Sequence, residues 1–346
     1  MSINKKYFDE KEIKEYKCLC DEKGYLSNES IGWAKKPIID CNISKHLLRK
    51  KKWNYWYMVN DECLFSVTIV NVDYIGMVFT YLYDFTDGEF TEDTQVIPFA
   101  LGCNMSKNVF DNMEFSNRKT NIFFKWEKEN NIMKIIVNYN NFMRKKLTAY
   151  FNVIYSKDYE TLNVVIPWNE NRFQFTSKQN CIPVDGEVRL DEKSYKFYKE
   201  NSFAGLDFGR GVWPFKIMWN WATFSGIQKD NLIGINLGGK WTDGTGITEN
   251  AISINNKIIK LNENIIYDYD FNNLMGTWNI RTEISDKVNL QFHPLYDRIS
   301  KTKFLILGSK VHQIIGEFSG YIRNKKEEKI LIENIKGIAE EHNARW

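Results

Sequence analysis

From Trp53 onwards the chain alternates short apolar runs, rich in aromatic and β-branched residues, with short polar breaks. This pattern is typical of β-strands joined by tight turns. The clearest runs are WNYWYMV, CLFSVTIV and YIGMVFTYLYDF, and the breaks between them, Asn60-Asp61 and Asn71-Val72-Asp73, suit hairpins. After residue 50 the sequence shows no sustained helical period and no alternation of strands with helices. The pattern therefore predicts an all-β protein of antiparallel strands.

The predicted strands form two successive sets with a spacing of roughly ten residues per strand. The more polar segment 178–204, which contains a Val-Asp-Gly-Glu turn, separates the two sets. The first 22 residues have alternating charges and little to bury, so we expect an irregular or helical extension there. We predict an extension over residues 1–22, an N-terminal β domain over 23–190 and a C-terminal β domain over 191–346. The two β domains are expected to be antiparallel barrels or sandwiches packed together.

Composition supports this architecture and disfavours several classes of protein. Aromatic residues make up 15% of the 346 residues, which suits packing on pleated sheets. The net charge of +3, from 47 basic and 44 acidic residues, is too balanced for a nucleic-acid-binding surface. No apolar run is long enough to span a bilayer, and the N-terminal residues do not form a secretory signal. The six cysteines and four histidines are scattered, which predicts reduced thiols in the cytoplasm and no metal or other cofactor.

Segment 206–226, LDFGRGVWPFKIMWNWATFSG, combines large aromatic and polar side chains more densely than any other part of the chain. With a period of two, Asp207 shares one face of an extended segment with Trp213, Trp219 and Trp221, and the opposite face contains the polar residues Arg210 and Asn220. Pro214 is expected to bend the segment, so the alternation applies only on each side of it. A core strand would explain the tryptophans alone, with Asp207 paired to Arg210 at a strand end. A ligand site would also explain the polar groups, because each needs a partner if it is buried.

Residues 236–250 form a glycine-rich polar segment that lacks the spacing of a phosphate-binding loop. We expect a loop at the rim of a barrel, with Glu249 and Asn250 at the mouth of a pocket. A carboxyl group surrounded by tryptophans has a raised pKa and can act as a general acid. Tryptophan faces can also stabilise a developing cation. Asp207 and Glu249 are therefore the predicted catalytic acids. The predicted substrate-binding residues beside them are Arg210, Trp213, Trp219, Asn220, Trp221 and Asn250.

A second polar group contains Arg281, Tyr296 and Asp297. These residues could orient the polar end of a substrate, or they could form a structural ion-pair cluster. No motif supports a nucleophilic serine or cysteine, because the chain contains no Gly-x-Ser-x-Gly sequence. The C-terminal segment, including Glu340 and Glu341, is expected to be structural.

Several motifs resemble the bacterial domain-of-unknown-function family 2804, and the resemblance extends from Gly24 to Trp346. They are GYLSNESIGWAKKPIIDC, KKWNYWYMVNDECLFSVTIVNVDYIG, LDFGRGVWPFKIMWNWA, NLGGKWTDGTGITENA, GEFSGY and IKGIAEEHNARW. The family supplies no activity. The all-β layout is also similar to the two-domain lipocalin-like group that includes carotenoid hydratases, tocopherol cyclases and fungal pericyclic cyclases. That resemblance implies two lipocalin-like domains, an aromatic-lined pocket between them, a hydrophobic substrate and an acid that protonates it. It assigns no residue.

We predict a small-molecule enzyme that binds a partly hydrophobic ligand and catalyses acid-assisted hydration, isomerisation or cyclisation without a cofactor. One alternative is a carbohydrate-active enzyme, which should place two carboxyl groups across an open cleft roughly 5–10 Å apart. The other is a noncatalytic lipid carrier, whose pocket should be apolar and contain no buried acid. The sequence leaves the oligomeric state open.

Overall fold

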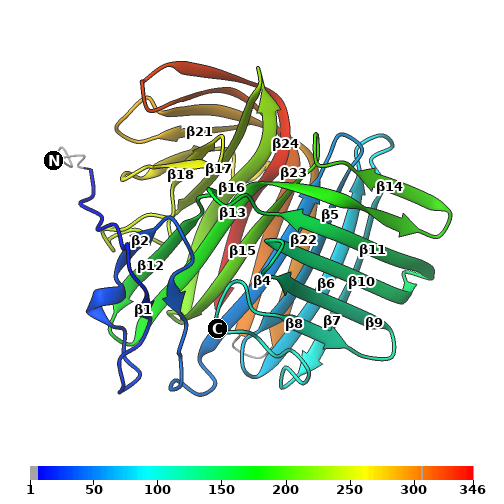
Figure 1. Ribbon diagram of the computed structural model, residues 1–346, viewed down its shortest axis with the longest axis horizontal. Helices are drawn as coiled ribbons and strands as arrows, with labels where there is room; N and C mark the ends of the chain where they lie inside the picture. The colour runs from blue at the N-terminus through cyan, green and yellow to red at the C-terminus, as the bar shows by residue number, and fades with distance from the viewer. Residues whose placement is uncertain (1–6, 305–306, 346) are drawn as a thin grey trace.

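The computed structural model describes residues 7–304 and 307–345. Within these residues the protein is almost entirely β-structure, with 24 strands, one 3-10 helix (η1, Asn28–Ser30) and no α-helix. Two large antiparallel sheets, each curled into a half-barrel, make up the molecule (Figure 1). The predicted all-β class and the pair of lipocalin-like β units are confirmed.

The first sheet contains thirteen strands, and every pairing in it is antiparallel. Its main path is, in order, β7 (Phe90–Pro98), β6 (Ile75–Asp84), β5 (Cys63–Asn71), β4 (Lys50–Val59), β15 (Phe203–Val212), β13 (Arg172–Leu190), β11 (Lys145–Ile154), β10 (Ile132–Phe142), β9 (Thr120–Glu127) and β8 (Met113–Ser116). Strands β12 (Leu162–Asn169), β14 (Lys193–Phe197) and β2 (Gly32–Ala34) lie off this path. A small separate sheet pairs β1 (Lys17–Cys18) with β3 (Ile39–Asp40).

The second sheet contains nine strands in the order β19 (Lys257–Lys260), β18 (Ala251–Ile254), β17 (Asn231–Gly239), β16 (Lys216–Gln228), β24 (Lys329–Arg345), β23 (Leu307–Arg323), β22 (Val288–Phe304), β21 (Trp278–Thr282) and β20 (Ile265–Asp268). It curls far enough for the hydroxyl of Tyr267 on β20 to donate to the carbonyl of Leu237 on β17, at 2.8 Å.

The chain crosses from the first sheet to the second between Val212 and Lys216, which is later than the expected division at residue 190. Strands β14 and β15, which lie in the expected C-terminal part, both pair with β13 of the first sheet. The turn that joins the sheets contains Trp213 and Pro214, so it lies inside the tryptophan-rich segment.

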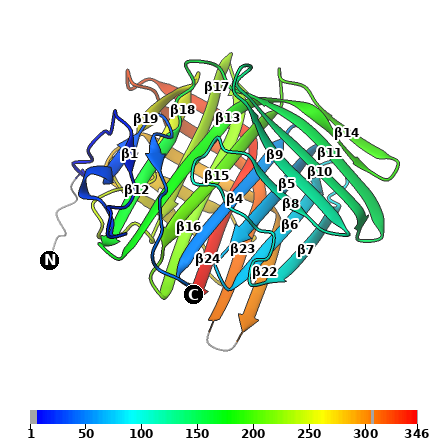
Figure 2. The same ribbon diagram turned by 60° about the horizontal axis from the view of Figure 1, so that its bottom comes forward.

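The two faces of β4 contribute to two different cores. Trp56 and Met58 belong to the core enclosed by the first sheet, whereas Tyr55 and Tyr57 belong to an aromatic layer that also contains Trp221 of the second sheet. Successive side chains of a strand point to opposite faces, so a strand buried on both faces needs apolar residues at every position. This requirement explains the almost continuous aromatic run from Trp53 to Val59. Figure 2 shows β4, β16 and β24 crossing the middle of the molecule.

Replacing Phe318 by alanine should lower the free energy of unfolding by about 3–5 kcal/mol, because it leaves a cavity in the second core. Phe318 is fully buried, and its ring centroid lies 4.6 Å from that of Phe292 and 5.2 Å from that of Phe224. Leu331→Ala on the same sheet is the control, because Leu331 is 48% exposed. Urea unfolding measures both variants. Equal losses in the two variants would contradict this packing.

Candidate active site

A pocket with a volume of about 170 Å³ lies between the facing surfaces of the two sheets. Five indole rings form much of its wall, from Trp53, Trp213, Trp219, Trp221 and Trp241. We call it the inter-sheet pocket. Its other lining residues are Lys51, Tyr55, Thr68, Val70, Val72, Met77, Phe79, Thr94, Gln174, Thr176, Lys178, Asp207, Glu249, Arg298, Ser300, Thr302, Ser309, Val311, Gln313, Glu340 and His342.

Strand alternation places the tryptophan-rich segment on this wall. On β15, Asp207 faces the pocket, and on β16, Trp219 and Trp221 do the same. A glycine makes room for the neighbouring ring, since a Cβ on Gly209 would lie 2.2 Å from the indole of Trp53. The segment therefore forms a close-packed aromatic surface rather than an isolated core strand.

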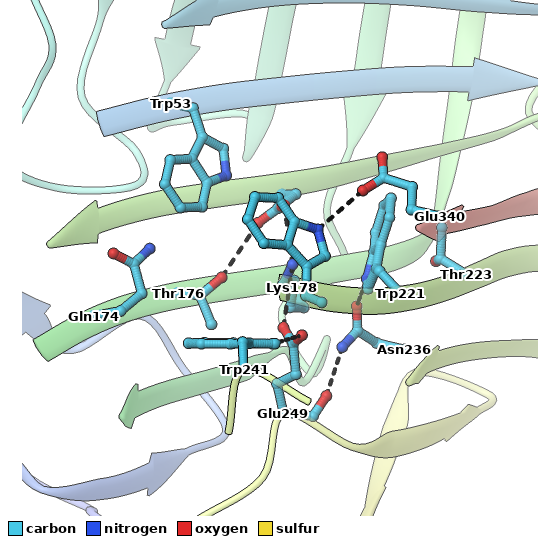
Figure 3. A network of polar contacts seen from close by, with 12 residues as sticks. Trp53, Gln174, Thr176, Lys178, Trp221, Thr223, Asn236, Trp241, Glu249 and Glu340 are labelled. Carbon is cyan, nitrogen blue, oxygen red and sulfur yellow. Dashed lines mark hydrogen bonds and ion pairs between the residues drawn. The ribbon is translucent and has the colours of Figure 1, made fainter. Parts of the chain in front are cut away.

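Lys178 on β13 joins two carboxylates at the floor of the pocket (Figure 3). Its ammonium nitrogen lies 2.9 Å from Oδ2 of Asp207 and 3.2 Å from Oε2 of Glu249, and 4.8 Å from the ring centroid of Trp221. The side chain of Lys178 is only 7% exposed and that of Glu249 only 2%. Two carboxylates and one ammonium leave a surplus of negative charge at a site shielded from water.

Neutral donors complete the shell around these carboxylates. The indole nitrogen of Trp241 donates to Oε1 of Glu249 at 2.5 Å, and the hydroxyl of Thr176 donates to Oδ1 of Asp207 at 3.2 Å. Asn236 accepts from the indole of Trp221 and donates to the backbone carbonyl of Glu249. These bonds fix the loop that contains Glu249 against β16 and β17.

Burial raises the pKa of Glu249, and the charge of Asp207 adds to the effect, while Lys178 acts in the opposite direction. Burial alone would lower the pKa of Lys178, but the two carboxylates outweigh it and raise that pKa. Lys178 therefore stays charged, and Glu249 binds a proton more readily than a carboxyl group in water does.

Glu340 on β24 is a third buried carboxyl group, and it lines the pocket beside Trp219. Gln313 donates to its Oε1 at 2.5 Å, and the indole of Trp219 donates to its Oε2 at 3.3 Å. Within the described part of the chain, no lysine or arginine forms an ion pair with Glu340. Burial raises the pKa of this carboxyl group. Its environment therefore favours the protonated form.

His342 lies two residues further along β24, and its ring centroid is 3.9 Å from that of Trp219. Burial lowers its pKa to about 3, so the ring is neutral near pH 7. Its Nε2 lies 2.6 Å from the hydroxyl oxygen of Ser309.

An ion pair joins the two sheets along one side of the pocket. Arg298 on β22 donates to both carboxylate oxygens of Glu92 on β7, at 2.5 and 3.1 Å. Its guanidinium carbon also lies 4.5 Å from the ring centroid of Phe79. Nearby, the ring of Tyr296 stacks on Phe90 with centroids 4.4 Å apart.

The structure brings five predicted site residues together in the pocket: Asp207, Glu249, Trp213, Trp219 and Trp221. The alternative partner for Asp207 is wrong, because Asp207 pairs with Lys178 and not with Arg210.

Three predicted binding residues lie outside the pocket and bind protein groups instead. Arg210 occupies the opposite face of β15, is 1% exposed and donates to Trp53, Ser106, Gly209 and Asn54. Asn220 donates to Tyr269 and to the carbonyl of Glu340. Asn250 accepts from the amide of Gly238 and donates to the carbonyl of Glu263. The donor groups of these three side chains are bound within the fold, whereas Oδ1 of Asn220 is buried without a hydrogen-bond partner among the described residues.

The second predicted polar group is also separate from the pocket. Arg281 is exposed on β21, and Tyr296 belongs to the aromatic layer between the sheets. Asp297 lies 2.7 Å from Nδ1 of His312. The structural interpretation of this group therefore fits Asp297 best.

Sequence reasoning missed Lys178 and Glu340. Lys178 is the first residue of the more polar segment 178–204, which predicts a boundary between the two sets of strands. Its role depends on the register of β13 against β15, which pairs Lys178 with Asp207. Glu340 directly follows Ile338 and Ala339 on β24, where the pattern of apolar residues predicts a buried position. A carboxyl group at such a position was the signal in the sequence that could have identified it as a site residue.

Among residues 7–304 and 307–345, no group of three or more histidine, cysteine, aspartate or glutamate side chains is arranged to hold a metal ion. The helices in this part of the chain include none that is long and apolar enough to cross a membrane.

Fold and pocket together define a two-unit, lipocalin-like β protein with a buried acidic site. The chain belongs to the family described as domain of unknown function DUF2804, whose model matches residues 10–346, so the resemblance seen in the sequence is confirmed. Kievitone hydratase from Nectria haematococca has a similar structure, with a TM-score of 0.53 and 9% identity over 85% of this chain and 88% of that one. CghA with Sch210972 gives a TM-score of 0.40 and 9% identity over 86% and 88%. No curated protein matches the sequence.

Lys178→Met should lower the free energy of unfolding by about 3–5 kcal/mol at pH 8, because it leaves two carboxylates buried without a cation. A carboxyl group with a raised pKa binds its proton more tightly in the folded state, so protonation stabilises the fold as the pH falls. The loss should therefore shrink as the pH approaches 4.5, the ordinary pKa of Glu249.

Lys145→Met is the matched control, because Lys145 forms an exposed pair with Glu89 at 3.2 Å. It should cost less than about 1 kcal/mol at either pH. Denaturant titrations at pH 5 and pH 8 measure both variants. A loss in Lys178→Met that does not depend on pH would contradict the buried triad.

Proposed function

We propose that this protein is a hydratase- or isomerase-type enzyme that protonates a partly hydrophobic small molecule inside the inter-sheet pocket. The proposal rests on the surroundings of Glu340, a buried carboxyl group that accepts hydrogen bonds from neutral donors and lies beside an aromatic wall. The ion-paired triad of Asp207, Lys178 and Glu249 lines the same pocket. The fold that the chain shares with kievitone hydratase is consistent with this class of reaction.

Glu340 is the proposed general acid. Across the described ranges 7–304 and 307–345, its two oxygens accept from the neutral groups of Gln313 and Trp219 alone, and burial raises its pKa. Transfer of its proton to a carbon–carbon double bond leaves a carbocation on the substrate. The indole faces of Trp219 and Trp221 and the negative surplus of the triad would stabilise that cation.

Asp207 is the proposed base, because its side chain is the most exposed of the three carboxylates, at 16%, and Lys178 keeps it oriented. In a hydration, a water oxygen bonds to the cation and its proton passes to Asp207, so the sum is the addition of one water. In an isomerisation or cyclisation, Asp207 removes a proton from a substrate carbon instead. Glu249 holds Lys178 in place from the other side.

The geometry disfavours both alternatives. A carrier pocket should lack buried acids, whereas three carboxyl groups line this one. A glycosidase needs two carboxyl groups facing each other across a gap that a sugar can enter. Asp207 and Glu249 instead contact the same ammonium group, which occupies the space between them.

Once a substrate is known, Glu340→Gln should lower kcat by about 10²–10⁴-fold, because amide nitrogen cannot donate the proton. Native mass spectrometry of protein purified from its own host identifies the co-purifying ligand that leads to this substrate. In the wild type, kcat should fall as the pH rises through the raised pKa of Glu340, since the acid must be protonated.

Glu341→Gln is the control, because Glu341 is buried on the opposite face of β24 and accepts from Tyr269. It should leave kcat within about twofold of the wild type. Equal turnover in Glu340→Gln, Asp207→Asn and the wild type would refute the acid and base roles. A co-purifying glycan would favour the carbohydrate-active alternative.

A further inference from the structure

One end of the molecule gathers exposed apolar side chains. Leu47, Leu48, Phe99, Leu101 and Phe215 are 80, 55, 76, 70 and 40% exposed, and we call them the apolar rim. Isolated exposed hydrophobic residues are ordinary, but several large ones at one end of a molecule mark an interaction surface.

Sheet register shows that these residues share one end. The start of β4 pairs with the end of β15, and the end of β7 pairs with the start of β6. The turn between β15 and β16 places the start of β16 at the same end, where it pairs with the end of β24. These strand ends lie toward the bottom of Figure 2, as do the end of β22 and the start of β23.

The segments around the apolar rim carry more basic than acidic side chains. Segments 44–49, 98–108, 213–216, 300–302, 308–310 and 343–345 contain no acidic residue. They contain seven exposed basic residues: Lys45, Arg49, Lys107, Lys216, Lys301, Lys310 and Arg345. Neighbouring turns also contain acids, among them Asp21, Glu22, Asp73, Asp111, Glu170 and Asp243, of which Asp73 pairs with Lys50. The basic residues remain in excess.

The inter-sheet pocket extends to these strand ends, because residues at the end of β22 and the starts of β6 and β23 line it. Its buried acids lie deeper, with Glu249 1% and Glu340 9% exposed. Met77, Thr302 and Ser309 line the part nearest the strand ends and are partly exposed. A molecule entering from this end would pass the apolar rim before it reached the carboxyl groups.

We propose that this end of the protein docks on an anionic lipid surface. The apolar rim enters the headgroup region of the bilayer, while the basic residues contact lipid phosphates. The surface of an anionic bilayer offers apolar acyl chains to the apolar rim and phosphates to the basic side chains. A protein partner would need a face that is both apolar and acidic to do the same. The docking surface does not depend on the chemistry proposed for the pocket.

Co-sedimentation of the full chain with vesicles tests the proposal. The wild type should bind vesicles of phosphatidylcholine mixed with phosphatidylglycerol, and binding should weaken in high salt because ions screen the charges. Phe99→Ser with Leu101→Ser should weaken binding by about tenfold or more, because two exposed apolar side chains are lost. Both residues are largely exposed, so this variant should fold, and its urea midpoint checks that it does.

Ile227→Ser with Leu331→Ser is the matched control. These two residues are 47 and 48% exposed and lie at the opposite strand ends, so the pair should bind vesicles as the wild type does. Equal binding to pure phosphatidylcholine, or unchanged binding by the Phe99 and Leu101 variant, would overturn the proposal. A dimer that this variant dissociates would also overturn it, because the rim would then bind a second copy.

Discussion

The buried ammonium of Lys178 is the interaction on which the centre of this molecule depends. It extends from β13 of the first sheet, pairs with Asp207 on β15 and reaches Glu249 in the loop after β17 of the second sheet. An isolated carboxylate in this position would lose its hydration without compensation. One cation therefore allows two acids to occupy the junction of the sheets, and it positions the loop that also supplies Trp241.

The sequence was sufficient to predict the strands and the aromatic wall. Period-two alternation requires only local regularity, so Trp219 and Trp221 could be assigned to one face of their own strand without knowledge of the fold. Their position beside Asp207 depends on the turn at Trp213 and Pro214, which joins the two sheets. The same alternation put Arg210 and Asn220 on the opposite face, where the structure has them. What alternation could not give was the surroundings of that opposite face, which proved to be a core with hydrogen-bond acceptors for the guanidinium group of Arg210.

Lys178 and Glu340 could not be predicted for a related reason. The position of each depends on pairing between strands that are far apart in the sequence, such as β16 with β24. A lysine in a polar stretch and a glutamate near the C terminus are ordinary surface residues until register places them in a pocket. The change of sheet at Val212 has the same origin, because β15 reads as part of the second set but hydrogen-bonds in the first.

The pocket gives its carboxyl groups different partners, and this difference is what would allow acid and base to coexist. Asp207 contacts an ammonium group, whereas Glu340 contacts an amide and an indole in a site shielded from water. Neutral donors stabilise a charge less than a cation does, so desolvation dominates at Glu340 and raises its pKa. In the proposed reaction, this difference in partners makes Glu340 the proton donor and Asp207 the proton acceptor within one aromatic cavity.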